Sequence, residues 1–252
     1  MKIDFPVPKQ YQQLIALWQE AFGDTEEFVD GFFCTGFSPA RCRCITVNRK
    51  VAAALYWLDV TCGEQRFAYL YAVAVEEKRR GKGLFRELMA DTHAHLALRG
   101  YDGVLLVPQT EQLHGLYEKL GYRTCTTVAE FTAGAGDTPL TLQRIDREEY
   151  ARLRRDLLPP GAAVEDGESI AFLETMAFFY RGEGVLLAAH AENGKLRCPE
   201  LLGDASAAPG IVKALNCTEG RFRTPGDTVP FAMFLPLAED TLPPCYLGYA
   251  FD

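Results

Sequence analysis

VAVEEKRRGKGLF, residues 73–85, runs from an apolar, strand-like stretch through a basic turn into a helical pattern. Gly81 and Gly83 allow the backbone of the turn to bend tightly and to approach a ligand closely. The first N–H groups of the following helix have no partner inside the helix and carry partial positive charge. Together with Arg80 and Lys82, these N–H groups predict an anion site suited to a pyrophosphate.

The turn is also rich in cations, because the nine residues 78–86 include five lysines or arginines and no acid. In a chain of net charge −8, that density indicates a ligand with several phosphates; the plainer alternative is a basic turn that faces solvent. A P-loop needs Ser or Thr directly after its lysine, but Gly83 follows Lys82. A dinucleotide-binding turn needs a third glycine after the first strand of an alternating unit, whereas Phe85 and Arg86 follow here. Both nucleotide-binding classes are therefore excluded.

Hydrophobic periodicity and turn residues predict the helices and strands on both sides of this segment. Helices are expected over 9–22, from a cap at Asp24 or Thr25 to Phe33, from Gly83 to Gly100, and over 110–120, 147–157, 168–179 and 206–215. Strands are expected over 2–5, 41–47, 51–61, 67–75, 103–107, 122–131, 140–145, 185–189, 195–202, 220–224, 230–236 and 245–250. The small, flexible stretch 133–139 is predicted to separate two domains, residues 1–132 and 139–252.

The basic turn resembles the acetyl-CoA signature of the GCN5-related N-acetyltransferase (GNAT) family. That signature is Gln/Arg-x-x-Gly-x-Gly/Ala after a strand, and this chain has Arg80-x-x-Gly83-x-Phe85 after Val73–Val75. Arg80 and Gly83 match the signature, and Phe85 departs from its last small position. The resemblance implies that acetyl-CoA is the cosubstrate.

A second motif follows at the expected distance. The sequence LYEKLGY, residues 116–122, resembles the family's Phe/Leu-Tyr-x-x-x-Gly-Phe/Tyr at the end of a helix. The order of the predicted elements over residues 1–131 also agrees with the family. The resemblance implies the GNAT acyl-CoA N-acyltransferase fold, an α/β (α+β) fold in which helices flank a mixed, mostly antiparallel sheet.

One subgroup of the family is similar over a longer stretch. The run GLFRELM, residues 83–89, and the bulky Phe85 resemble the enhanced-intracellular-survival-type aminoglycoside acetyltransferases. That subgroup carries a second, degenerate GNAT-like domain. The elements predicted after residue 139 fit such a domain, and they include no second phosphate-binding turn.

The resemblance implies roles for the residues of both motifs. The backbone of Val73, Ala74 and Val75 would pair with the pantetheine arm like an added strand, and one N–H would polarise the thioester carbonyl. The pyrophosphate would be held by Arg80, Gly81, Lys82, Gly83, Leu84 and Phe85. Thr110 stands where the family often has an Asn that contacts the cosubstrate. Tyr117 matches the tyrosine that protonates the departing thiolate.

The acceptor is expected to be a small-molecule or peptide amine, attacked directly on the thioester. Such an amine is protonated at neutral pH, so its attack requires removal of a proton. The candidate bases are Glu76, Glu77, Glu111, Glu118 and a carboxylate acting through water. Whether the terminal carboxylate of Asp252 enters the site, as it does in the subgroup, is left open.

Two other function classes are weighed against the enzyme. Because Phe85 and Thr110 depart from the family pattern, the chain could be a non-catalytic acyl-CoA-binding sensor or scaffold. It could also be a plain interaction domain without a ligand. The remaining aromatic and imidazole groups are expected to be structural, with Tyr56, Trp57, Tyr69 and Tyr71 in sheet packing and His93, His95 and His114 as ordinary helix residues.

Composition excludes several other partners. A pI near 5.2 argues against nucleic-acid binding, and the longest apolar run, Val51–Leu58, is far shorter than the roughly 20 residues of a membrane span. No Cys-x-x-Cys pair occurs among the eight cysteines, so no metal site is expected and the thiols are expected to be reduced. The amino-terminal residues lack an apolar signal core, which predicts a cytoplasmic protein. A homo-oligomer is left open.

Overall fold

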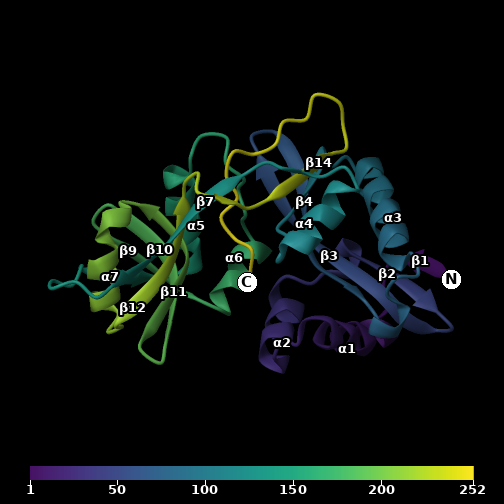
Figure 1. Ribbon diagram of the computed structural model, residues 1–252, viewed down its shortest axis with the longest axis horizontal. Helices are drawn as coiled ribbons and strands as arrows, with labels where there is room; N and C mark the ends of the chain where they lie inside the picture. Colours follow the sequence, from purple (N-terminus) through teal and green to yellow (C-terminus); the bar gives the residue numbers. More distant parts are fainter. Residues whose placement is uncertain (252) are drawn as a thin grey trace. The chain divides into compact units, whose positions relative to one another are not determined.

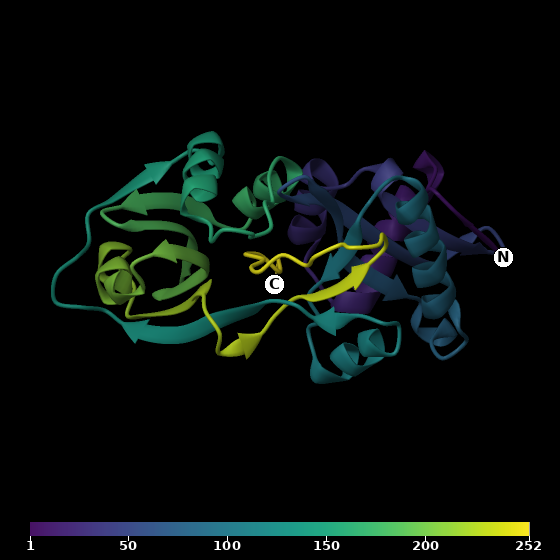
Figure 2. The ribbon, with the colours of Figure 1, turned by 90° about the horizontal axis from the view of Figure 1, so that it is seen from above.

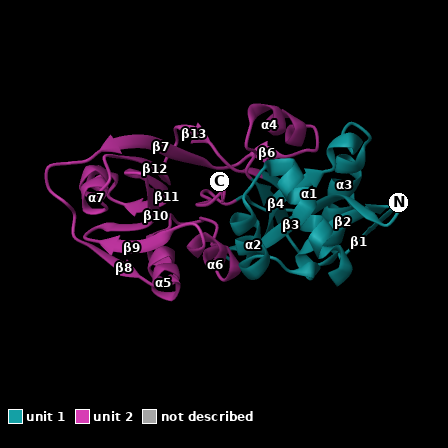
Figure 3. Ribbon diagram, turned by 90° about the horizontal axis from the view of Figure 1, so that it is seen from below, with its two compact units in different colours: residues 1–106, 234–243 teal, residues 107–233, 244–252 magenta. Residues whose placement is uncertain are grey.

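The computed structural model describes residues 1–251 and shows two compact units (Figure 1). One unit consists of residues 1–106 and 234–243, and the other of residues 107–233 and 244–252 (Figure 3). Each unit contains a mixed, mostly antiparallel sheet with helices beside it. The predicted α/β (α+β) fold class is confirmed. The domain division at residues 133–139 stays a prediction.

The sheet of the first unit has the strand order β1-β2-β3-β4-β5-β14. Neighbouring strands from β1 to β4 are antiparallel, and β4 and β5 are parallel. The strands are β1 (Lys2–Asp4), β2 (Cys42–Val47), β3 (Lys50–Cys62), β4 (Gln65–Val75), β5 (Gly103–Leu106) and β14 (Met233–Pro236). The helices are α1 (Tyr11–Phe22), α2 (Glu26–Thr35) and α3 (Leu84–Leu98), with 3-10 turns at Pro8–Gln10, Pro39–Arg41 and Glu77–Arg79.

Alternation along β3 places the helices of the first unit on opposite faces of its sheet. The Tyr56 ring lies 5.2 Å from the Trp18 ring of α1, whereas the next side chain, Trp57, lies 6.2 Å from the His95 ring of α3. Both Tyr56 and Trp57 are buried, as is Tyr69. These aromatic side chains therefore pack the sheet against its helices, as predicted.

The second unit repeats this strand order. Its sheet runs β13-β7-β12-β11-β10-β9-β8, in which β11 and β12 are parallel and the other pairs are antiparallel. The strands are β7 (Thr127–Gly134), β8 (Leu142–Ile145), β9 (Phe178–Gly182), β10 (Val185–Glu192), β11 (Lys195–Gly203), β12 (Glu219–Pro225) and β13 (Val229–Pro230). The unit also contains α4 (Glu111–Glu118), β6 (Arg123–Thr124), α5 (Arg147–Leu157), α6 (Glu168–Glu174), a 3-10 turn (Ala205–Ala207) and α7 (Ala208–Ala214).

The two sheets exchange their last strands. In the first sheet β5 is followed by β14, which comes from the end of the chain, and in the second sheet β12 is followed by β7, which comes from its middle. Figure 2 shows the teal β7 beside the green strands of the second sheet, while the yellow β14 lies with the first. Phe234 of β14 packs its ring 5.8 Å from that of Phe67 on β4. Each sheet thus contains a strand that is distant in sequence from the strand beside it.

Three predicted elements have different bounds in the structure. The strand over 122–131 is divided into β6 and β7, because the Cys125 N–H bonds to the Ala232 carbonyl instead of continuing the ladder. The helix over 168–179 ends at Glu174, where the hydroxyl of the next residue, Thr175, donates to the Phe172 carbonyl at 2.7 Å. The strand over 230–236 is divided into β13 and β14.

The expected strand over 245–250 is also wrong. This segment has no regular secondary structure, although Tyr246, Leu247 and Tyr249 are buried. The Tyr246 carbonyl accepts from the Ala163 N–H at 2.8 Å, and the Gly248 N–H donates to a Glu165 carboxylate oxygen at 3.1 Å. Buried side chains and a loop satisfy this backbone in place of a neighbouring strand.

Some features concern the described residues as a whole. No helix within residues 1–251 has the length and apolar character needed to cross a membrane. In the same residues, no three His, Cys, Asp or Glu side chains are gathered where they could hold a metal ion. All eight cysteines are free thiols.

Candidate active site

Strand β4 extends well beyond its neighbour β5. The parallel register joins Phe67–Tyr69 to Gly103–Leu105 and then stops, whereas β4 remains paired with β3 as far as Val75. The segment from Tyr71 to Val75 therefore has its β5-side edge outside the parallel ladder. Such an edge can pair with the amide groups of an extended ligand.

A β-bulge lies at the start of this segment. The register with β3 shifts between Ala54 and Tyr56, so that Ala72 and Val73 together stand opposite one residue of β3. Ala72 has φ 48°, a left-handed conformation that costs a non-glycine residue about 1–3 kcal/mol. A bulge bends its strand and turns the backbone that follows it. The bulge therefore sets the direction of Val73, Ala74 and Val75.

The turn between β4 and α3 depends on two glycines. Gly81 has φ 75° and Gly83 has φ 85°, a region that other residues rarely adopt. A Cβ atom placed on Gly81 would meet nothing within 4 Å, so the backbone there faces open space. The two glycines are needed for the shape of the turn and leave its surface accessible.

The cations of the turn fall into two groups. Lys78 and Arg79 form ion pairs with Glu76 at 2.7 and 2.5 Å. By contrast, Arg80 donates from Nε to the Val75 carbonyl at 3.2 Å, and Lys82 donates from Nζ to the Lys78 carbonyl at 2.9 Å. Within the described residues neither Arg80 nor Lys82 has an acidic partner, and both are exposed. These two side chains are therefore available to an anionic ligand.

Helix α3 begins directly after the turn. Gly83 is its N-cap, and the first bond within the helix runs from the Glu87 N–H to the Gly83 carbonyl at 3.1 Å. The N–H groups of Leu84, Phe85 and Arg86 precede that bond and lie at the positive end of the helix dipole. Buried residues of α3, including Leu84 and Leu88, anchor the helix in the core of the first unit. The structure thus brings the predicted residues Arg80 to Phe85 together around one helix N-terminus, next to the end of β4.

Glu76, one of the candidate bases, is occupied in the turn. Its hydrogen bond from Lys78, and that from Arg79, hold the pKa of the carboxyl below its ordinary value. A base with a lowered pKa is a weak proton acceptor. Glu76 is therefore a poor candidate, and its place in the turn is structural.

Two predicted site residues, Thr110 and Tyr117, belong to the second unit. The Thr110 hydroxyl caps α4 by accepting from the Leu113 N–H at 3.2 Å. Tyr117 lies near the end of α4 with its ring 5.6 Å from that of Tyr122. Tyr117 is 7% exposed, and burial raises the pKa of its phenol to about 12. Both residues come from a different unit than the basic turn, and their roles stay predictions.

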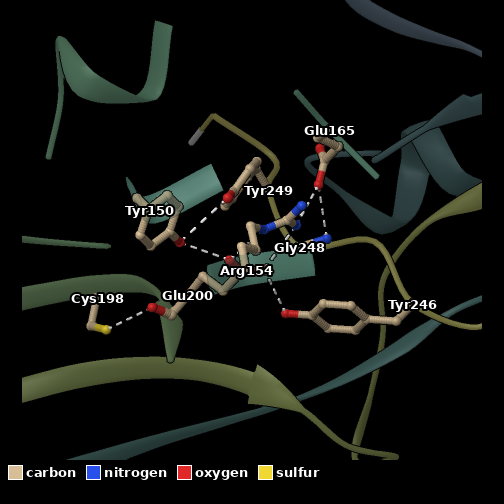
Figure 4. Close-up of polar contacts among 8 residues, drawn as sticks. All are labelled: Tyr150, Arg154, Glu165, Cys198, Glu200, Tyr246, Gly248 and Tyr249. Carbon is tan, nitrogen blue, oxygen red and sulfur yellow. Dashed lines mark hydrogen bonds and ion pairs between the residues drawn. The ribbon is translucent and has the colours of Figure 1, made fainter. Parts of the chain in front are cut away.

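A buried ionic cluster in the second unit was not predicted (Figure 4). Arg154 of α5 donates to Glu200 of β11 at 2.7 Å and to Glu165 at 3.1 Å, and all three side chains are at most 1% exposed. The sequence gives no local signal for it, because Arg154 stands beside Arg155 and Glu165 beside Asp166, as at many surface positions. Tyrosine hydroxyls complete the cluster, with Tyr150 2.8 Å from a Glu200 oxygen, Tyr246 3.1 Å from the other Glu200 oxygen, and Tyr249 3.3 Å from the Tyr150 hydroxyl.

This cluster holds the end of the chain. Gly248 fits tightly, because a Cβ atom placed on it would overlap a Glu200 oxygen and the Arg154 guanidinium. The Arg154 guanidinium also lies 4.4 Å from the Tyr249 ring centre. The described part of the terminal segment is therefore fixed within the second unit. Asp252, whose carboxylate was considered for the active site, lies outside the described residues.

Comparisons with known proteins agree with this fold. No curated protein matches the chain in sequence. Among solved structures, a GCN5-related N-acetyltransferase from Kribbella flavida is 18% identical with a TM-score of 0.69, over 92% of this chain and 70% of that one. Eis1 from Mycobacterium abscessus is 12% identical with a TM-score of 0.69, over 94% of this chain and 73% of that one.

A tandem GNAT protein from the clavulanic acid biosynthesis pathway matches this chain in fold over nearly its whole length. It is 10% identical with a TM-score of 0.58, and the match spans 95% of this chain and 100% of that one. At these identities the likenesses show a shared two-unit fold. The family model described as an acetyltransferase (GNAT) domain matches residues 3–125 of the sequence itself. Residues 3–125 therefore carry an acetyltransferase (GNAT) domain, and the chain as a whole shares the fold of GCN5-related N-acetyltransferases.

Proposed function

We propose that this protein is an acetyl-CoA-dependent N-acetyltransferase that acts on a primary amine. The observation that carries the proposal is the continuity of three features in the first unit. The open edge of β4 leads through the bulge at Ala72 into a glycine turn, and the turn opens onto the N-terminus of α3. An extended arm followed by a pyrophosphate suits this arrangement of backbone donors and cations.

The residues of the turn fit the cosubstrate in chemistry as well as in order. Arg80 and Lys82 would neutralise phosphate charge, and the helix N–H groups from Leu84 onward would bind phosphate oxygens. Val73, Ala74 and Val75 would hold the pantetheine arm by backbone hydrogen bonds. Acetyl-CoA supplies the activated acetyl group, and a backbone N–H of this strand would polarise its carbonyl.

Tyr117 is the proposed general acid. Because burial raises the pKa of the phenol to about 12, Tyr117 keeps its proton throughout the neutral range. A positioned acid that protonates a departing thiolate contributes roughly 10²–10⁴ in rate. The amine would lose its proton to a carboxylate other than Glu76 or to water linked to one.

The test separates binding from turnover. In the Tyr117→Phe variant, we expect kcat to fall by about 10²–10⁴ while calorimetric affinity for acetyl-CoA is unchanged. The matched control is Tyr180→Phe, which removes a hydroxyl from a partly buried tyrosine of β9 in the same unit. Binding of acetyl-CoA without transfer to any amine of a broad panel would favour a non-catalytic acyl-CoA sensor. Absence of binding would contradict both functions.

A further inference from the structure

The basic turn begins with a short 3-10 helix that has no cap of its own. This helix, Glu77–Arg79, follows Glu76, whose side chain makes no capping hydrogen bond. The Glu76 carboxylate instead forms ion pairs with Lys78 and Arg79. The first N–H groups of a helical turn have no partner inside the turn, so they need an acceptor from elsewhere. The N–H of Glu77 is the first of these groups.

Glu20 of α1 supplies the missing acceptor. Its carboxylate oxygen Oε1 accepts from the Glu77 N–H at 2.7 Å, across 57 positions of the sequence. This hydrogen bond is charge-assisted, and bonds of this kind are roughly twice as strong as those between neutral groups. The cap of the 3-10 helix therefore comes from another element of the first unit and not from the turn itself.

A second side chain of α1 is bonded to the same end of the sheet. Gln13 Oε1 accepts at 2.9 Å from the N–H of Val51, near the start of β3. The next residue, Ala52, accepts at its carbonyl from the Glu76 N–H at 2.9 Å. Gln13 and Glu20 are close to two helical turns apart, so both lie along one side of α1. Helix α1 is thus bonded to one backbone N–H of β3 and to another just after β4, where the turn leaves the sheet.

The bond to Glu77 leads directly to a proposed ligand of the pyrophosphate. The Glu77 carbonyl accepts from the N–H of Arg80, the residue that ends the 3-10 helix, at 3.1 Å. Glu77 is therefore held at its N–H by Glu20 and at its carbonyl by Arg80. The Arg80 side chain in turn donates to the Val75 carbonyl at 3.2 Å. Release of the Glu77 N–H would loosen the backbone from which Arg80 projects.

Two local effects disfavour an acid at position 20. Glu20 lies in the last turn of α1, where the negative end of the helix dipole repels a carboxylate. Its charge is also close to a turn that would bind the phosphates of acetyl-CoA, and like charges repel. Because Glu20 is exposed, the packing of the core does not require it. The hydrogen bond to Glu77 explains why a carboxylate stands here.

We propose that Glu20 is a positioning residue for the cosubstrate, and that it acts through its hydrogen bond to the Glu77 N–H and not through its charge. This role rests on the proposed function, since it concerns the binding of acetyl-CoA. Glu20 fixes the start of the turn, so that Arg80 and the glycines after it keep the shape that receives the pyrophosphate. A turn that is fixed before binding loses less conformational entropy when the ligand binds.

Two substitutions separate the hydrogen bond from the charge. Glu20→Gln keeps an oxygen that can accept from the Glu77 N–H but removes the negative charge, whereas Glu20→Ala removes both. In calorimetric titrations of the full chain with acetyl-CoA, we expect Glu20→Ala to weaken binding about 5–10-fold, as for the loss of one hydrogen bond. Glu20→Gln should bind at least as tightly as the parent. A role through charge alone predicts tighter binding in both variants and would overturn the proposal, as would weaker binding in Glu20→Gln.

Amide hydrogen exchange of the ligand-free chain tests the turn itself. We expect exchange in residues 76–83 to be faster in Glu20→Ala than in the parent and unchanged in Glu20→Gln. The matched control is Glu64→Ala, which removes an exposed carboxylate from the turn at the other end of β3 and β4. It should change neither the exchange of residues 76–83 nor the affinity for acetyl-CoA.

The outcomes distinguish this role from the proposed function. If the parent binds acetyl-CoA and Glu20→Ala binds it equally well, the positioning role is wrong and the proposed function stands. If the parent does not bind acetyl-CoA, the proposed function is contradicted, and the positioning role with it. Unchanged exchange of residues 76–83 in Glu20→Ala would also overturn the positioning role, because the turn would then keep its shape without the cap.

Discussion

The crossovers β4–α3–β5 and β11–α7–β12 have the same topology, but the side chains at their turns differ in charge. Each joins two parallel strands through a helix, and in each the strands separate beyond a short register. The first connection holds Arg80 and Lys82 and opens α3, a helix of 15 residues. The second has Asp204 at the corresponding turn, where it accepts from the Ser206 N–H, and opens α7, a helix of 7 residues. The two crossovers thus share a strand order and differ in the charge of their turns, and the proposed pyrophosphate binding depends on the basic turn of the first.

Outside its crossover, the second unit also contains the buried ionic cluster around Arg154. We expect the largest effect of any substitution from the removal of Arg154. Arg154→Met leaves Glu165 and Glu200 buried without their shared cation. We expect the free energy of unfolding to fall by about 3–5 kcal/mol, measured by urea denaturation. Arg152→Met, an exposed arginine on the same helix, should change it by less than about 0.5 kcal/mol. Equal effects of the two substitutions would show that the buried cluster has no special weight.

The first crossover should respond in ligand binding and not in stability. In Arg80→Gln/Lys82→Gln, we expect the affinity for acetyl-CoA to fall about 10–100-fold, or about 1.4–2.8 kcal/mol, with Tm unchanged. The reason is that both side chains are exposed and bond only to backbone carbonyls. Asp204→Asn in the second crossover serves as the counterpart and should leave affinity unaltered. Calorimetric titration measures both; if Asp204→Asn also changed the affinity, the assignment of the coenzyme to the first crossover would fail.

The smallest expected effect is the pH dependence of the free energy of unfolding of the second unit. Burial raises the pKa of Glu165 to about 8, above its ordinary value of 4.5. Between these two values the unfolded chain has lost a proton that the folded chain retains, so stability falls as pH rises, by about 1.4 kcal/mol per pH unit from this group. Above the folded pKa the contribution levels off.

Urea denaturation at pH 6 and pH 7 measures this slope. Glu165→Gln keeps an oxygen that can accept from the Gly248 N–H but cannot ionise, so the difference between the parent and the variant isolates Glu165. Identical slopes for the two proteins would mean that Glu165 is already ionised in the folded state. The first crossover contains no comparable buried carboxylate among its described residues. Its affinity for acetyl-CoA should therefore show no pH dependence of this origin.

Local sequence signals were sufficient to predict most helices and strands of the first unit. Thr25, one of the two predicted caps, caps α2 because its hydroxyl accepts from the Phe28 N–H, and Gly81 and Gly83 form the tight turn expected of them with positive φ values. The bulge at Ala72 has no such signal, since alanine usually avoids this conformation. Its cause is the register with β3, which is a property of two strands and not of one.

Contacts between residues far apart in the sequence account for the other differences between the predictions and the structure. Alternating apolar residues in 245–250 look like a strand, but their hydroxyl and amide groups are satisfied by Glu200 and Glu165, which lie 46 and 83 positions away in the sequence. Likewise, the exchange of β7 and β14 cannot be found from local patterns, because both segments are ordinary strands in themselves.

The exchanged strands also bear on how the protein is made. A ribosome releases the chain from its amino terminus at about 5–20 residues per second. The first sheet cannot be completed until β14, Met233–Pro236, has emerged, long after β5. During that interval the outer edge of β5 and the Phe67 ring lack their final neighbours. A fragment ending at residue 132 would lack β14, so the first unit depends on residues 233–236 to complete its own sheet.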